Sequence, residues 1–130
     1  MMMYTIDIPK TIPLSLNKML RLHWRARNKL KSAWMEEFYA FSVVERQKLR
    51  QWASVKLQMT VRVIIHHSRA YDPDSLVACV KPCLDGLVCQ RFLWDDAPDY
   101  LNLIVEQQIC PHKQRHTVIS IGVESQKEQQ

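Results

Sequence analysis

Alternation of apolar and polar residues predicts strands in four parts of the chain. Residues 4–8 alternate between apolar and polar up to Pro9. Within residues 55–67, an apolar residue occupies every second position as far as Ile65, so that these side chains share one face. This period of two is typical of a strand with one buried face. Residues 117–123 show a similar run, and a further strand is expected at residues 101–109 from the apolar positions Leu101, Leu103, Val105 and Ile109.

Spacings of three and four residues predict helices between these strands. One amphipathic helix with its aromatic residues in the core is expected from apolar positions at Leu30, Trp34, Phe38, Phe41, Val44, Leu49 and Trp52. A second helix is expected within residues 75–89, where the stripe facing the core is Val77, Val80, Leu84, Leu87 and Val88. The segment that joins the first strand to the first helix, up to about Asn28, is expected to be irregular.

The order of these elements predicts an α+β fold, with two helices packed on one face of a mixed four-stranded sheet. A chain of 130 residues suits a single domain, expected at residues 1–123, followed by a polar tail at residues 124–130. No apolar run approaches the roughly 20 residues of a membrane span, and the N-terminus lacks the features of a signal peptide. A cytoplasmic location without a membrane partner is therefore expected.

Positive charge is concentrated near the N-terminus of this basic chain, whose formal net charge is +5. Between Ile8 and Met35 there is no acidic residue, and His23 and Trp24 lie among seven basic ones: Lys10, Lys18, Arg21, Arg25, Arg27, Lys29 and Lys31. Such a segment suits a nucleic-acid backbone, because each neutralised phosphate releases condensed counterions. The alternative is a solvated basic loop without a partner.

The four cysteines show no C-x-x-C pair, so buried, reduced thiols are expected for Cys79, Cys83, Cys89 and Cys110. Cys110, His112 and His116 could bind zinc, but they are only three ligands at irregular spacing. The alternative for these three residues is a turn between two strands.

Acidic residues gather where the second helix is expected. Six of the thirteen acids lie between Asp72 and Asp99, and five of them form the groups Asp72–Asp74, Asp85 and Asp95–Asp96 around Lys81. Several carboxylates with one ammonium are suited to holding Mg²⁺ against a phosphodiester. Each group also has a structural alternative: a turn at Asp72 with Asp74 as a helix cap, a solvated turn at residues 95–96, and a surface ion pair of Lys81 with Asp85.

Taken together, these motifs resemble the RusA family of Holliday-junction resolvases, which are small Mg²⁺-dependent endonucleases of bacteria and their phages. The resemblance spans about residues 4–123 and is carried by Pro13-Leu14-Ser15-Leu16-Asn17, His23-Trp24-Arg25, Asp72-Pro73-Asp74-Ser75, Lys81-Pro82, Asp85-Gly86-Leu87 and Trp94-Asp95-Asp96-Ala97. It implies a homodimer that makes paired nicks across a four-way DNA junction during recombination and repair, in the cytoplasm of a bacterium, with the gene in the host or in a phage.

The resemblance also assigns roles to residues. Asp72, Asp74 and Asp96 would bind Mg²⁺, with Mn²⁺ as a substitute, and would be catalytic together with Lys81. Asp85 and Asp95 would be supporting carboxylates. The expected DNA-binding residues are Asn17, Lys18, Arg21, Arg25, Arg27, Lys29 and Lys31.

Two features depart from the family pattern. Ser75 stands where asparagine is usual, and the step from Asp74 to Lys81 is three residues longer than is common. Three residues rotate a helix by about 300° and advance it by about 4.5 Å, which would put Lys81 one turn too far away. Pro82 is tolerated in the first turn of a helix, so a helix that starts near Val80 would relieve this mismatch.

These departures leave a second interpretation open, in which a catalytically impaired RusA-like protein binds branched DNA without cutting it. A different class of D-x-D enzyme, such as a nucleotide-sugar transferase, is disfavoured because its nucleotide-binding half would not fit in 130 residues with two glycines.

Overall fold

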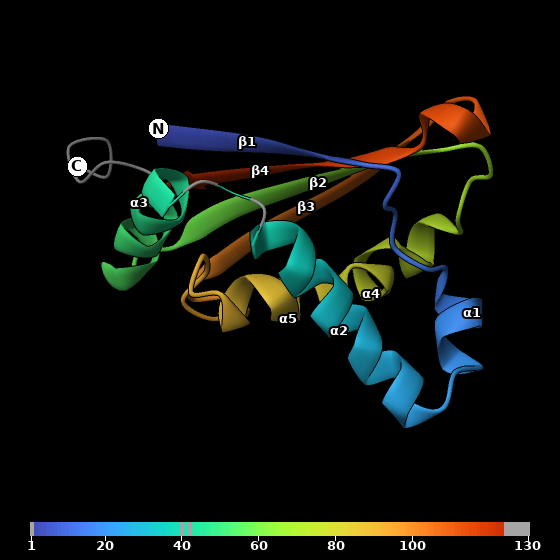
Figure 1. Ribbon diagram of the computed structural model, residues 1–130, viewed down its shortest axis with the longest axis horizontal. Coiled ribbons are helices and arrows are strands. Elements are labelled where there is room, and N and C mark those ends of the chain that lie inside the picture. Colours follow the sequence, from blue (N-terminus) through green and yellow to red (C-terminus); the bar gives the residue numbers. More distant parts are fainter. Residues whose placement is uncertain (1, 40, 42, 124–130) are drawn as a thin grey trace.

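A mixed four-stranded sheet forms one layer of the protein (Figure 1). The computed structural model describes residues 2–39, 41 and 43–123. The strands are β1 (Met2–Pro9), β2 (Met59–His67), β3 (Leu101–Ile109) and β4 (His116–Val123), in the spatial order β1-β4-β2-β3. β2 and β3 are parallel, and β4 is antiparallel to both of its neighbours. The predicted α+β fold with this sheet is confirmed, whereas the predicted tail at residues 124–130 lies outside the described residues.

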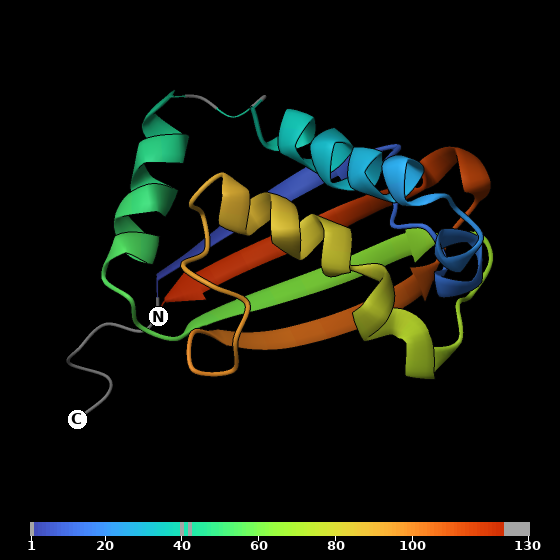
Figure 2. The same cartoon turned by 90° about the horizontal axis from the view of Figure 1, so that it is seen from below.

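The α-helices form a second layer on one side of the sheet (Figure 2). They are α1 (Leu16–Leu20), α2 (Trp24–Tyr39), α3 (Val43–Ser54), α4 (Leu76–Cys79) and α5 (Lys81–Cys89), and the short 3-10 turns are η1 (Pro73–Ser75) and η2 (His112–Gln114). The prediction that helices cover one face of the sheet is therefore correct, but the structure has more α-helices than the two predicted. Among the described residues, no helix combines the length and apolar character that crossing a membrane requires.

β2 supplies the centre of the core through Met59, Val61, Val63 and Ile65, which are fully buried on the face that the helices cover. The predicted start of this strand at residue 55 is wrong, because Val55 is exposed and pairing begins at Met59. The chain leaves α3 through Lys56, which has a φ of 58° and donates its backbone N–H to Ala53 O at 3.2 Å. Residues 55–58, whose alternation resembled that of a strand, therefore connect α3 to β2.

The single helix predicted across residues 30–52 is wrong. α2 ends at Tyr39, α3 begins at Val43, and Val44 is exposed although its spacing predicted a buried position. Phe41 lies between the two helices, where its ring stacks on Phe92 with centroids 6.1 Å apart and an interplanar angle of 18°. The break lets α3 cover the end of the sheet that α2 does not reach (Figure 1).

Residues 75–89 are helical, but they form two helices joined at Val80. Val80 has φ −90° and ψ 0°, and Pro82 lies in the first turn of α5, where its missing N–H is tolerated. The predicted helix start near Val80 is confirmed. Because α4 is separate from α5, Val77 does not continue the buried stripe and is 60% exposed, contrary to the prediction.

The basic segment is helical where an irregular chain was expected. Ser15 caps α1 by accepting the backbone N–H of Lys18 at 3.4 Å, and His23 Nδ1 accepts the N–H of Arg25 at 3.3 Å where α2 begins. A serine directly before a helical run is a recognised N-cap signal, so the sequence did contain this information. The two helices give the basic side chains fixed positions.

The close contact of α2 with α5 depends on Gly86, and this gives a first prediction. A Cβ built on Gly86 would lie 3.1 Å from Phe38 Cε2 and 3.3 Å from Trp34 Cβ. Gly86→Val is therefore expected to destabilise the protein by about 1–3 kcal/mol, because the larger side chain forces the two helices apart. Urea denaturation measures the effect. The control Ala33→Val, on the exposed face of α2, should cost less than about 0.7 kcal/mol; an equal loss in both variants would contradict the prediction.

Candidate functional site

A cleft of about 680 Å³ lies among α1, α2, α4, α5 and the start of β3. Its wall is mostly apolar, with Leu20 and Val77 among the contributing side chains. Three cations and two carboxylates also line it: Arg27, Lys31, Lys81, Asp85 and Asp96. These residues come from segments far apart in the sequence, so the cleft is a product of the tertiary fold.

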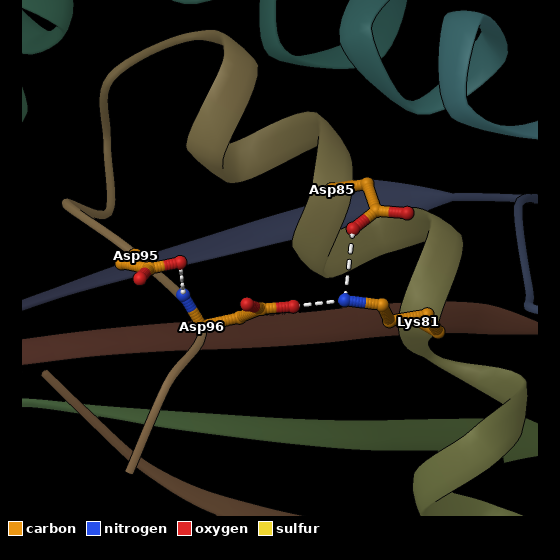
Figure 3. Close-up of polar contacts among 4 residues, drawn as sticks. All are labelled: Lys81, Asp85, Asp95 and Asp96. Carbon is orange, nitrogen blue, oxygen red and sulfur yellow. Dashed lines mark hydrogen bonds and ion pairs between the residues drawn. The ribbon is translucent and has the colours of Figure 1, made fainter. Parts of the chain in front are cut away.

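Lys81 lies between two carboxylates in this cleft (Figure 3). Its Nζ is 3.1 Å from Asp85 Oδ1, one helical turn further along α5, and it also pairs with Asp96 Oδ2 from the loop that follows α5. Asp95 Oδ1 accepts the backbone N–H of Asp96 at 2.8 Å and so holds that loop. Figure 3 shows the side chains of Asp85 and Asp96 directed toward Lys81, whereas Asp95 is directed toward the backbone of Asp96.

The contact between Lys81 and Asp96 favours the charged form of both side chains. The hydrogen bond from Lys81 lowers the pKa of Asp96, and the same bond raises the pKa of Lys81, with a further contribution from Asp85. The Lys81 side chain is 55% exposed, so water screens these ion pairs and each contributes only about 0–1 kcal/mol to stability. The arrangement therefore matters for the position and charge of Lys81 more than for the free energy of unfolding.

Asp72 and Asp74 lie outside this cluster. Asp72 caps η1 by accepting the backbone N–H of Asp74 at 3.1 Å, and both residues are exposed. Neither lines the cleft, because α4 separates them from Lys81. In the described part of the chain, no three His, Cys, Asp or Glu side chains are placed to hold a metal ion together. The structure thus brings together Lys81, Asp85 and Asp96, but it does not bring Asp72 and Asp74 to them.

The segment before Asp72 is firmly attached to the rest of the fold. Tyr71 donates its hydroxyl to Pro13 O at 2.6 Å, and its backbone N–H donates to Gln107 Oε1 at 2.9 Å. Gln107 also bonds His67 Nε2 at 2.9 Å, and His67 is buried. These contacts tie the turn of Asp72 to β3 and to the segment that leads into α1.

Most of the predicted DNA-binding residues form an exposed surface on α1 and the first half of α2. Trp24 is 60% exposed there, and the guanidinium of Arg25 lies 5.3 Å from its ring centroid. Arg27 has a structural part as well, because it donates to Leu20 O at 2.9 Å and thereby holds the corner between the helices. Lys31 is partly buried in the cleft, and the remaining predicted residues are exposed: Asn17, Lys18, Arg21, Arg25 and Lys29.

The other candidate chemistry is engaged elsewhere. His116 stacks on His66 with ring centroids 4.1 Å apart, and burial lowers the pKa of His66. His112 Nε2 lies 3.2 Å from Arg115 Nη1. Cys79 and Cys83 are buried as predicted, and burial raises the pKa of both thiols. Contrary to the prediction, Cys89 is exposed and Cys110 is only half-buried.

Sequence reasoning missed the apolar wall of the cleft. Leu20 and Val77, which line the cleft, are 58% and 60% exposed. The polar side chain of Asn28 from α2 also lines it. The break before Pro82 was the available signal for Val77, because it separates α4 from the buried stripe of α5.

Comparison of the chain with protein-family models and with curated proteins finds no match. Function is therefore inferred from the residues of this chain.

Proposed function

We propose that this protein is a RusA-like, Mg²⁺-dependent endonuclease that cuts four-way DNA junctions at the Lys81 cluster. The observation that carries the proposal is the cleft, in which Lys81, held between Asp85 and Asp96, lies beside Arg27 and Lys31. A phosphodiester is an anion, and the two α2 cations supply attraction at the edge of the same cleft. The lysine–carboxylate cluster supplies groups that can act on it.

Lys81 is suited to stabilise charge on the reacting phosphate. Asp85 and Asp96 orient its ammonium and keep it protonated, so it requires little reorganisation when a phosphate oxygen approaches. Preorganised cations of this kind stabilise the charge that develops during displacement at phosphorus. Asp85 and Asp96 therefore act as positioning residues for Lys81.

The carboxylates of the cluster are the type of ligand that Mg²⁺ prefers. Mg²⁺ is usually held by one or two carboxylates together with waters and substrate phosphates. Asp85 and Asp96 both face the Lys81 ammonium, so a metal beside it would be held by the carboxylate oxygens that do not pair with Lys81, and Asp72 and Asp74 provide a second carboxylate pair one short helix away. When bound, the metal lowers the pKa of an attacking water and stabilises the departing oxygen. Mn²⁺ has the same preference for oxygen ligands and should replace it.

The surface of α1 and α2 is proposed to bind the DNA backbone near the branch point. Its exposed cations, Lys18, Arg21, Arg25 and Lys29, contact phosphates without reading bases, which suits recognition of a branched shape over a sequence. Paired nicks in two strands require two active sites, so we propose that the protein acts as a homodimer.

A cleavage assay tests the proposal. Labelled four-way junction and matched linear duplex are incubated with the protein, with and without Mg²⁺. Symmetric nicks are expected on the junction only, and only with the metal. Equal cutting of the linear duplex would reject junction selectivity, and cutting with Mg²⁺ removed by chelation would reject the metal requirement.

The variant Asp74→Asn measures the part played by the Asp72–Asp74 turn. It is expected to slow junction cleavage by about 10-fold, the lower end of what outer groups around a metal contribute, because Asp74 lies outside the cleft. An unchanged rate would exclude Asp74 from the reaction. Complete loss would mean that the turn joins the cluster when DNA and metal bind.

A second candidate function is binding of branched DNA without cutting, which the separation of Asp72 and Asp74 from Asp96 favours. In that case the junction would bind in an electrophoretic mobility assay, but no nicks would appear with either Mg²⁺ or Mn²⁺.

A further inference from the structure

A second cleft, of about 620 Å³, lies at the other end of the helical layer. It is formed by α3, the end of α5 and the segment that leads into the Asp95–Asp96 loop. Figure 2 shows α3 and α1 at opposite ends of the sheet, with α5 between them. The loop that carries Asp96 therefore connects this second cleft to the Lys81 cluster.

In the described part of the chain, the charged residues that line the second cleft are both arginines, Arg50 and Arg91. Arg50 is held in place, since its Nε donates to Gln90 O at 3.0 Å and its Nη2 donates to Gln90 Oε1 at 3.3 Å. Arg91 is exposed, and its backbone has a φ of 63°. Among residues 2–39, 41 and 43–123, no carboxylate lines this cleft, so these residues form a cationic concavity suited to an anion.

An exposed aromatic ring completes the cleft. Trp94 is 45% exposed, and Lys56 Nζ lies 4.5 Å from its ring centroid. A nucleobase can take the place of a cation on an exposed indole, because every base has a flat face and the exposed cation–π contact is weak. Lys56 would then be available to a phosphate beside the ring.

We infer that this second cleft binds an unstacked nucleotide of the DNA, with the base on Trp94 and the phosphate at Arg91 and Lys56. The inference rests on the proposed function and extends it, because the DNA would run from the α1–α2 surface past Lys81 to the α3 end. The nine residues of β2 span about 30 Å, so DNA that runs along the sheet from the α1 end to the α3 end would cover this length. In a duplex strand, about 30 Å is the rise of roughly nine nucleotides. An aromatic platform requires a base released from its stack, which is available at a branch point or in a single strand.

Binding measurements without Mg²⁺ test this inference independently of cleavage. The affinities of four-way junction and of single-stranded oligo(dT) are compared for the wild type, Arg91→Glu and Trp94→Leu. Arg91→Glu is expected to weaken junction binding about tenfold, and Trp94→Leu to weaken oligo(dT) binding at least about fivefold. Trp94→Phe should retain most of the affinity, because its ring still stacks.

The matched control is Lys48→Glu, which makes the same charge change on α3 outside the cleft, where Lys48 faces the Trp52 ring at 5.4 Å. Quenching of tryptophan fluorescence at saturating oligo(dT) should be smaller in Trp94→Leu, which a loss of affinity alone would not produce. Affinities of Arg91→Glu and Trp94→Leu equal to that of Lys48→Glu would overturn the second site alone. Failure of the wild type to bind the junction would overturn the proposed function as well.

Discussion

Replacing Lys81 by methionine is expected to slow cleavage of the four-way junction by about 10²–10³-fold, with a much smaller change in DNA affinity. Methionine keeps much of the length of lysine but removes the ammonium that faces Asp85 and Asp96. The reaction then lacks its preorganised cation, and the two carboxylates repel the phosphate. Single-turnover cleavage at saturating enzyme measures the rate, and binding without Mg²⁺ measures the affinity.

The matched control is Lys29→Met on the exposed part of α2, outside the cleft. It should weaken junction binding a few-fold and leave the rate at saturation unchanged, because it removes a phosphate contact only. Lys29→Met should keep its stability within about 0.5 kcal/mol, and Lys81→Met, which loses two exposed ion pairs, within about 2 kcal/mol. Cleavage by Lys81→Met at the wild-type rate would show that Lys81 takes no part in the chemistry.

Replacing Phe38 by alanine is expected to destabilise the protein by about 3–5 kcal/mol. Phe38 is fully buried, and its ring lies within 6.2 Å, between centroids, of the rings of Trp34, Phe41 and Phe92. The residue thus joins α2 to the segment that continues into the Asp95–Asp96 loop. Its truncation leaves a cavity where these elements meet, so the orientation of Asp96 should be affected along with the stability.

Urea denaturation of Phe38→Ala measures this effect, beside two comparisons. Phe38→Leu fills most of the space and should cost less than the alanine variant. Val44→Ala removes an exposed apolar side chain from α3 and should change the free energy of unfolding by less than about 0.5 kcal/mol. If Phe38→Ala and Val44→Ala lost the same stability, the aromatic group around Phe38 would not be the centre of the core.

The candidate site was predictable where its residues are neighbours in the sequence. Lys81 and Asp85 are one helical turn apart, so their ion pair followed from their spacing once a helix was expected. The pairing of Lys81 with Asp96 requires a loop to fold back on α5, and the family pattern predicted this proximity where the spacing could not. The same pattern predicted Asp72 and Asp74 beside Asp96, which the structure does not show, because α4 adds a turn between them.

The sequence by itself determined the four strands apart from the start of β2, the position of Pro82 in the first turn of α5 and the basic character of the N-terminal segment. Each of these depends on contacts or charges of near neighbours. Tertiary structure alone decided that Phe41 packs on Phe92 between α2 and α3, and that Arg27 and Lys31 meet Lys81 in one cleft. The physical reason is that burying apolar surface against distant segments outweighs local periodicity, and such contacts leave no regular spacing in the chain.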